Sequence, residues 1–333
     1  MKLSPHDAPY SAKSHFERIK KSPRWEDNEG VAATVGTIMS LLVFLTFMGI
    51  FTTQFVPVWM SDNESTHMSE AIGQFANLKS QMDISISNYP NSLIAPSPIF
   101  VPIGLSAPGI PIFAASTAGV LQMKPDITGE LPTFDLRYTW EAENGGIYEL
   151  DETNDGHAGG SLSLYCPNRY YVEQTVVYEA GAVILNQTDG EYVIAGPQFS
   201  IADIGSGTAQ GRVVKITQVT LEGDNRTIGG TGSKGVNADL RYASTTAYEN
   251  PNGSDLVMTV TTYHGWGWMN YFNTTLESSG LEYSTDFEIH YTYVEMEDDR
   301  DNYYVVVLTI FAVGILDHTY ATVDMSVGEL GIL

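Results

Sequence analysis

Two acidic segments of the chain carry residue types that can bind metal ions. The first is Asp151-Glu-Thr-Asn-Asp-Gly-His157, which begins like a calcium-binding loop. Its third position is Thr153, and its twelfth is Leu162, where such a loop places a bidentate glutamate. The pattern therefore favours an Asx-rich turn, in which short polar side chains hydrogen-bond the nearby backbone.

The second acidic segment is Glu295-Met-Glu-Asp-Asp-Arg-Asp-Asn302, which lies between two apolar stretches. We expect a solvated hairpin loop there. The alternative is a loop whose clustered carboxylates hold a calcium ion from the surroundings.

Other motifs of catalytic or metal chemistry are missing from the sequence. The seven histidines are scattered and form no His-x-x-x-His pair, and there is no Gly-x-Ser-x-Gly elbow, P-loop or dinucleotide fingerprint. The sequence thus predicts no catalytic residue, no metal ligand, no cofactor and no enzymatic activity. An exported hydrolase remains a third class of function, because a fold can assemble a site from distant residues.

The densest aromatic cluster consists of Trp266, Trp268, Tyr271 and Phe272. On an exposed surface these rings could stack on sugars. Their helical spacing favours packing in a core instead.

These candidate residues belong to an acidic chain with an uneven distribution of charge. The chain has 40 acidic and 16 basic residues, and six of the basic ones lie in residues 1–30 beside five acidic ones. So acidic a surface argues against nucleic acid as a partner, because phosphate binding requires a basic face. One cysteine, Cys166, excludes an intrachain disulfide, and we expect it to be buried and inert.

The chain is organised around the stretch from Val31 to Met60, which has no charged residue and no histidine. Val31 to Phe51 would rise about 31 Å as a helix, which matches the hydrocarbon core of a bilayer. Basic residues concentrate on the cytoplasmic side of a span, so residues 1–30 are expected in the cytoplasm and the acidic remainder outside the cell. Trp59 is interpreted as an interfacial anchor.

The chain thus begins with a polar leader that carries basic residues, followed by Gly30 and then by an uninterrupted apolar helix. This order resembles the N-terminus of archaeal type IV pilins and archaellin-like proteins. Gly30 stands at the cut position, and the matching run is Val35 to Met39. The resemblance implies cleavage between Gly30 and Val31 by a prepilin peptidase. The chain differs from the family in its residues before the cut, Asp27-Asn28-Glu29, where family leaders usually carry Lys or Arg.

Two further features of the apolar helix are expected to matter. Small residues at Ala32, Gly36 and Ser40 share one face, which allows close packing with another helix, although small residues are common in membrane helices anyway. Pro57 removes a backbone donor and clashes with the preceding turn, so we expect a kink there.

Residues 61–87 are predicted to form an amphipathic helix that packs on the outer domain. Its apolar residues recur at intervals of three and four: Met68, Ala71, Ile72, Phe75, Leu78 and Met82. The acidic residues Asp62, Glu64 and Glu70 are placed in the first turns of this helix, where the helix dipole favours acidic residues.

Residues 88–132 contain closely spaced prolines, and we expect an extended segment with short edge pairings at most. Residues 133–333 are expected to form an extracellular, mainly antiparallel β-sandwich-like domain, so that a fragment from Asn88 to Leu333 would be soluble and mostly β. The predicted strands are Phe134–Trp140, Leu162–Tyr165, Tyr170–Tyr178, Val183–Leu185, Tyr192–Ala195, Arg212–Leu221, Leu256–Tyr263, Phe287–Glu295 and Tyr303–Val313.

Three finer predictions accompany this list. The apolar residues of Val213–Leu221 change face, as a β-bulge would require. Val305–Leu316 is apolar throughout, which predicts a central strand buried on both faces. Trp268–Ser279 is predicted to be a helix.

The chain is therefore expected to be an α+β membrane-anchored protein of the cell surface with a structural function, either a filament subunit or a minor pilin that self-associates through its N-terminal helix. The alternative is a signal-anchored binding protein that recognises a glycan or a surface partner without polymerising. Five sequons beyond the span are candidate glycosylation sites: Asn63, Asn186, Asn225, Asn252 and Asn273.

Overall fold

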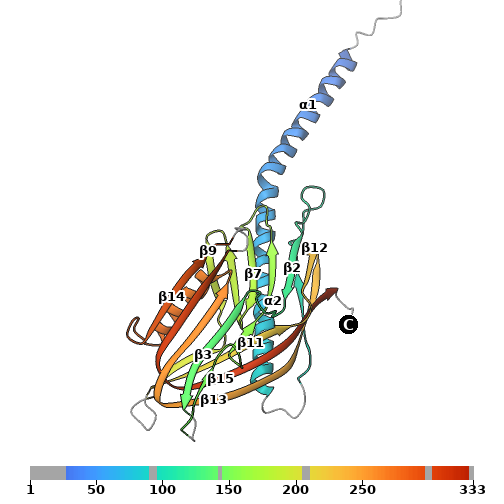
Figure 1. Ribbon diagram of the computed structural model, residues 1–333. Coiled ribbons are helices and arrows are strands. Elements are labelled where there is room, and N and C mark those ends of the chain that lie inside the picture. Colours follow the sequence, from blue (N-terminus) through green and yellow to red (C-terminus); the bar gives the residue numbers. More distant parts are fainter. Residues whose placement is uncertain (1–27, 90–95, 142–144, 205–210, 297–301, 330–333) are drawn as a thin grey trace, which may run out of the picture. The chain divides into compact units, whose positions relative to one another are not determined.

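The computed structural model describes residues 28–89, 96–141, 145–204, 211–296 and 302–329 (Figure 1). The expected leader, residues 1–30, lies almost wholly outside these ranges. The chain divides into two compact units, Met1–Thr53 and Gln54–Leu333.

One long apolar helix occupies the N-terminal region, as the sequence predicts. It comprises α1 (Asn28–Ile50), a short π-helix η1 (Phe51–Phe55) and α2 (Val56–Asn88). Its length and composition are sufficient to cross a membrane, and the apolar window in it has no buried residue. The π-helix ends two residues before Pro57, whose missing N–H cannot take part in the α-helical hydrogen bonds of the preceding turn. How far the helix bends there stays a prediction.

The second unit contains α2 and two mostly antiparallel β-sheets, which confirms the predicted fold class. The strands are β1 (Ile99–Gly104), β2 (Gly119–Lys124), β3 (Thr133–Glu141), β4 (Ile147–Leu150), β5 (His157–Gly159), β6 (Ser161–Cys166), β7 (Gln174–Glu179), β8 (Ala182–Gln187), β9 (Gly190–Ala195), β10 (Phe199–Ile204), β11 (Gly211–Glu222), β12 (Arg226–Gly230), β13 (Ser233–Thr262), β14 (Phe287–Val294) and β15 (Tyr303–Glu329). The nine-stranded sheet has the order β10-β11-β15-β13-β3-β4, with β1 on β13, β14 on β15 and β5 on β3. The six-stranded sheet has the order β12-β2-β6-β7-β8-β9.

The two longest strands, β13 and β15, pair along almost their whole length, from Lys234↔Glu329 to Thr262↔Tyr304. Their register shifts between Glu249 and Ser254, where β13 holds extra residues that include Pro251. A bulge of this kind bends a strand and increases its twist. The halves on either side of it contribute side chains to two different apolar clusters.

The first cluster surrounds α2. Along this helix one stripe of side chains is buried against strands of both sheets, and its members in the cluster are Met68, Ala71, Phe75, Leu78, Met82 and Ile86. The predicted amphipathic helix therefore buries one face against the two sheets and leaves its other face exposed. The second cluster is built around α3 (Gly265–Ser278), whose Trp268 and Phe272 are fully buried.

Three sequence expectations are corrected by the strand pairing. The proline-rich segment contains β2, which lies between β12 and β6 and is therefore an internal strand. β11 pairs with β15 in unbroken register from Val213 to Glu222, and the register shifts only before this stretch, between Arg212 and Val213. The change of apolar face within the stretch therefore reflects burial of both faces of the strand. β15 is central, but its alternate residues are half-exposed, because only one of its faces is covered there.

Candidate functional sites

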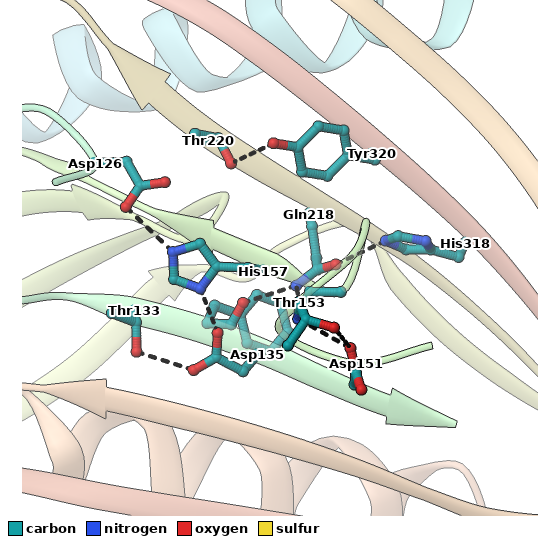
Figure 2. Close-up of polar contacts among 12 residues, drawn as sticks. Asp126, Thr133, Asp135, Asp151, Thr153, His157, Gln218, Thr220, His318 and Tyr320 are labelled. Atoms are coloured by element: carbon teal, nitrogen blue, oxygen red, sulfur yellow. Dashed lines mark hydrogen bonds and ion pairs between the residues drawn. The ribbon is translucent and has the colours of Figure 1, made fainter. Parts of the chain in front are cut away.

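A charged cluster forms where β3, β5 and the segment after β2 meet (Figure 2). His157 on β5 lies between two carboxylates, with Nδ1 2.5 Å from Asp135 and Nε2 3.3 Å from Asp126. Hydrogen bonds from the ring to both carboxylates raise the pKa of His157 to about 10. The imidazole is therefore charged near neutral pH and has no lone pair to accept a proton or bind a metal. This arrangement cross-links three segments and does not provide a general base.

A second polar group lies close to it, between β11 and β15 (Figure 2). The fully buried Gln218 donates to the carbonyl oxygens of Phe134 and Gly156, at 2.7 and 3.1 Å. Its Oε1 lies 2.7 Å from Nε2 of His318, which must then be the protonated nitrogen. Burial lowers the pKa of His318 to about 4, so this ring is neutral. His157 is thus charged and His318 neutral near neutral pH.

A third polar group surrounds the buried Glu179 on β7. Its Oε1 accepts from Thr262 Oγ1 at 2.6 Å and from Trp268 Nε1 at 2.8 Å. His264 lies beside it and contacts Glu191 Oε1 through Nδ1 at 3.3 Å. Burial disfavours a charge on His264, but the bond to Glu191 and the nearby carboxylates raise its pKa. These contacts fix the start of α3 against both sheets.

Two polar side chains on the buried stripe of α2 bind the β-rich part of the unit. The carboxylate of Glu64 accepts backbone N–H bonds from Arg169, Tyr170 and Tyr171, at 3.2, 2.8 and 2.7 Å. Nε2 of His67 lies 3.0 Å from the carbonyl oxygen of Gly104. Because Glu64 is buried and follows Val56 by two turns, its interpretation as a first-turn dipole residue is wrong.

Comparison of the chain with protein-family models, with curated proteins and with solved structures found no match.

The candidate residues of the apolar helix lie on α1. Gly30 and Val31 are in its first turn, and Ala32, Gly36 and Ser40 are all exposed. Among the described residues beyond its own helix, none has an atom within 4 Å of the position that a Cβ on Gly36 would take. The face of small residues is therefore open. Whether another helix covers it, and whether the leader is cut, stay predictions.

The acidic turn before β5 has the geometry that the sequence favours. Asp151 Oδ1 accepts from the backbone N–H of Thr153 at 2.9 Å and from its hydroxyl at 2.7 Å. These bonds lower the pKa of Asp151. Asn154 Oδ1 in turn accepts from the N–H of Asp151 at 2.9 Å. The prediction of an Asx-rich turn is confirmed.

The second acidic segment is described only at its ends, since residues 297–301 lie outside the described ranges. β14 and β15 pair antiparallel up to Val294↔Tyr303, so the segment does connect two strands of a hairpin. At its base, Asn302 Oδ1 accepts from the N–H of Met296 at 2.8 Å.

The aromatic cluster is divided between the core and the surface. Trp268 and Phe272 are buried, as their spacing predicts, whereas Trp266 is 49% exposed. The ring of Trp266 lies edge-on to that of Tyr291, with 6.4 Å between the ring centroids, and Tyr291 stacks on Tyr304 with 5.2 Å between the centroids. These residues and Tyr293 form a surface that we call the aromatic patch.

The five sequons differ in accessibility. Asn225 and Asn252 are exposed, whereas Asn63, Asn186 and Asn273 are partly buried. The amide of Asn63 also donates to the carbonyl oxygen of Pro108 at 3.2 Å. A glycan on Asn63 would have to break this bond, so Asn225 and Asn252 are the better candidates.

Proposed function

We propose that this chain is a membrane-anchored structural protein of pilin-like build, either a filament subunit or a minor pilin. One observation carries the proposal: an apolar helix with no buried residue in its membrane-length window continues in sequence into a helix that buries one stripe of side chains in a β-rich unit. Such a chain holds the β-rich unit at a membrane surface and leaves α1 free to pack with lipid or with other helices. The bias of basic residues toward residues 1–30 supports a cytoplasmic N-terminus and an extracellular β-rich unit.

Self-association through α1 is tested by changing the face of small residues. Lipid provides no hydrophobic drive between helices, so association depends on close backbone approach. Gly36→Leu adds bulk in the middle of that face without opposing insertion. Leu41→Ala, about 140° around the helix at 100° per residue, is the matched control. We expect weaker crosslinking in native membranes for Gly36→Leu alone. Equal crosslinking of both variants and the wild type would remove the support for a filament subunit.

Processing and topology are tested separately. If a prepilin peptidase cuts the leader, N-terminal sequencing of the membrane-embedded protein gives Val31 as the first residue. Peptides containing Met1 from that form would instead show an uncleaved signal anchor. Protease added outside intact cells is expected to digest the region from Ser61 onward and to leave residues 1–30 protected. The reverse pattern would overturn the orientation.

A second function is favoured by the aromatic patch: a non-polymerising, anchored protein that binds a glycan or a surface partner. Exposed rings of Trp and Tyr can stack on the apolar faces of sugars. In this patch Trp266, Tyr291 and Tyr293 are 49%, 36% and 45% exposed. Glycan-array binding that is lost in Trp266→Ala and kept in Tyr192→Ala would favour this function. Tyr192 is the control because it is 55% exposed and lies outside the patch, on β9.

A further inference from the structure

The segment between β1 and β2 carries an unusually apolar and exposed tip. Ile112 is fully exposed and Phe113 is 38% exposed. From Gly104 to Met123 the sequence contains no charged residue and no histidine. Exposed single apolar residues are common, but here they stand together at the end of an uncharged loop of a very acidic protein.

The tip is held in shape by its own backbone. The N–H groups of Phe113 and Ala114 donate to the carbonyl oxygen of Ile110 at 3.1 and 2.9 Å. Ile112 has a φ of 74°, a left-handed conformation that is costly for a β-branched residue. Glycine or asparagine would serve a water-exposed turn at lower cost. The isoleucine side chain is thus displayed outward at a position where the fold itself does not use it.

The contacts of the loop with α2 show where the tip points. Gly104 lies beside His67, and Pro108 accepts from Asn63, so the chain runs along α2 toward its N-terminal end. The four residues from Pro108 to Ile112 can extend about 13 Å farther. Nine helical residues, from Asn63 back to Gln54, rise about 14 Å. The tip can therefore reach the level at which the β-rich unit begins, and in Figure 1 the loop projects beyond β2 on that side.

The same end of the unit carries other exposed apolar side chains. Phe55, Val58 and Trp59 are 51%, 66% and 48% exposed. Gln54 lies three residues after Phe51, where the helix length that matches the hydrocarbon core ends, and three residues span at most about 11 Å. The headgroup region of a bilayer extends about 5–7 Å beyond the hydrocarbon core on each side. Gln54 and its neighbours are thus tied close to the membrane surface by the chain itself.

We propose that the tip formed by Ile110, Ile112 and Phe113 inserts into the interface of the lipid bilayer as a second contact of the β-rich unit with the membrane. This proposal rests on the proposed anchoring of the chain by α1. Lipid is favoured over another copy of the chain, because the loop lies at the end of α2 that the chain connection holds at the membrane. An uncharged apolar tip also avoids the cost of placing charge at that depth.

The test uses the full-length protein in lipid nanodiscs, with one cysteine introduced at a time and labelled with an environment-sensitive fluorophore. Ile112→Cys reports the tip. Ile147→Cys is the matched control, since Ile147 is 77% exposed on β4. β4 pairs with residues 138–141 of β3, just beyond the part of β3 that pairs with residues 257–261 of β13, whereas β1 pairs with residues 233–238 near the other end of β13. Leu42→Cys reports the span. The wild-type protein serves as the unlabelled blank. Its native Cys166 is buried, and burial raises the pKa of this thiol to about 12, so it does not react with the label.

We expect lipid-attached nitroxides to quench the label at Ile112 and at Leu42, and aqueous iodide to quench the label at Ile147. If iodide quenches Ile112 as readily as Ile147 while Leu42 stays in lipid, the loop proposal fails and the anchor stands. Protection of Ile112 from both quenchers, with crosslinking between copies, would overturn it in favour of a protein contact. Quenching of Leu42 by iodide would overturn the anchor and the loop proposal together.

Discussion

The structure predicts that the β-rich part of the chain does not fold without α2. Five large side chains of this helix are at most 2% exposed in the cluster between the sheets: Met68, Phe75, Leu78, Met82 and Ile86. The sequence alone predicts the opposite, a soluble domain that begins near Asn88. The decisive comparison is between two fragments, Gln54–Leu333, which keeps α2, and Asn88–Leu333, which lacks it.

The size of the effect follows from burial. Removing a large apolar side chain from water stabilises a fold by about 1.5–3 kcal/mol, so five of them contribute roughly 8–15 kcal/mol. The whole free energy of unfolding of a typical domain is only about 5–15 kcal/mol. Without α2, the facing strands would also expose their apolar side chains to water. Residual stability of the shorter fragment is therefore expected to be near zero or negative.

Urea unfolding followed by tryptophan fluorescence, with NMR amide dispersion as a second probe, measures this. Gln54–Leu333 is expected to show one cooperative transition and dispersed amide signals. Asn88–Leu333 is expected to show neither. A cooperative transition of the shorter fragment at the same urea concentration would refute the reasoning and would mean that α2 covers the sheets without completing their core.

Three smaller predictions concern single side chains in Gln54–Leu333. Phe75→Ala should lower the free energy of unfolding by about 3–5 kcal/mol. The control Ile84→Ala, on the exposed face of the same helix, should change it by less than about 0.5 kcal/mol. Similar losses in both variants would contradict the assigned faces. Glu64→Gln should lower the free energy of unfolding in urea by about 2–3 kcal/mol, because an amide group cannot accept from the three backbone N–H groups as a carboxylate does. A change of less than about 0.5 kcal/mol would show that these bonds are dispensable. Folding raises the pKa of His157 to about 10, so the protonated ring stabilises the folded state. This stabilisation is complete below about pH 6.5 and is lost as the pH rises toward 10. Folding lowers the pKa of His318 to about 4, so the neutral ring stabilises the folded state. This stabilisation is lost as the pH falls from about 6.5 to 4. The free energy of unfolding, measured from pH 4 to 10, should therefore fall less steeply at alkaline pH in His157→Gln than in the wild type. In His318→Gln it should fall less steeply at acid pH. Unchanged slopes would contradict both assignments.

Sequence periodicity predicts those elements in which one pattern persists over several turns or residues. The stripe of α2 and strands such as β6 and β8 carry their apolar residues at helical or strand spacing, and they are found where expected. The exposure of α1 likewise agrees with its uniform composition. In these elements local pattern and tertiary burial agree, so a single sequence is informative.

The same reasoning fails where burial depends on distant partners. The first half of β13 contains many polar residues, yet Val236, Ala238 and Leu240 are buried because they belong to the apolar cluster around α2. Pro251 argues against a strand by local rules, but it lies within the bulge, where its missing donor is tolerated. Such strands become visible once their neighbours in the sheet are known.

Candidate sites are harder to predict than elements, because their residues are far apart in the sequence. Asp126, Asp135 and His157 meet through three separate segments, and nothing in their local sequence marks them as partners. Glu64 did carry a signal, since it lies on the apolar stripe of α2 four residues before Met68. An acidic residue on the buried face of a helix requires donors, and this requirement is a stronger clue than its place near a presumed helix start.

The polar contacts of α2 also have a consequence for the membrane end of the unit. Apolar burial is non-directional, and Phe75 or Leu78 alone would tolerate a helix that slides or rotates within its groove. The bonds of Glu64 to the N–H groups of residues 169–171 and of Asn63 to Pro108 have one geometry, and they lie in the N-terminal half of the helix. They therefore fix the rotation and height of α2 beside the loop that carries Ile112. If they are weakened by Glu64→Gln, a label at Ile112 should lose part of its protection by lipid even though the loop itself is unchanged.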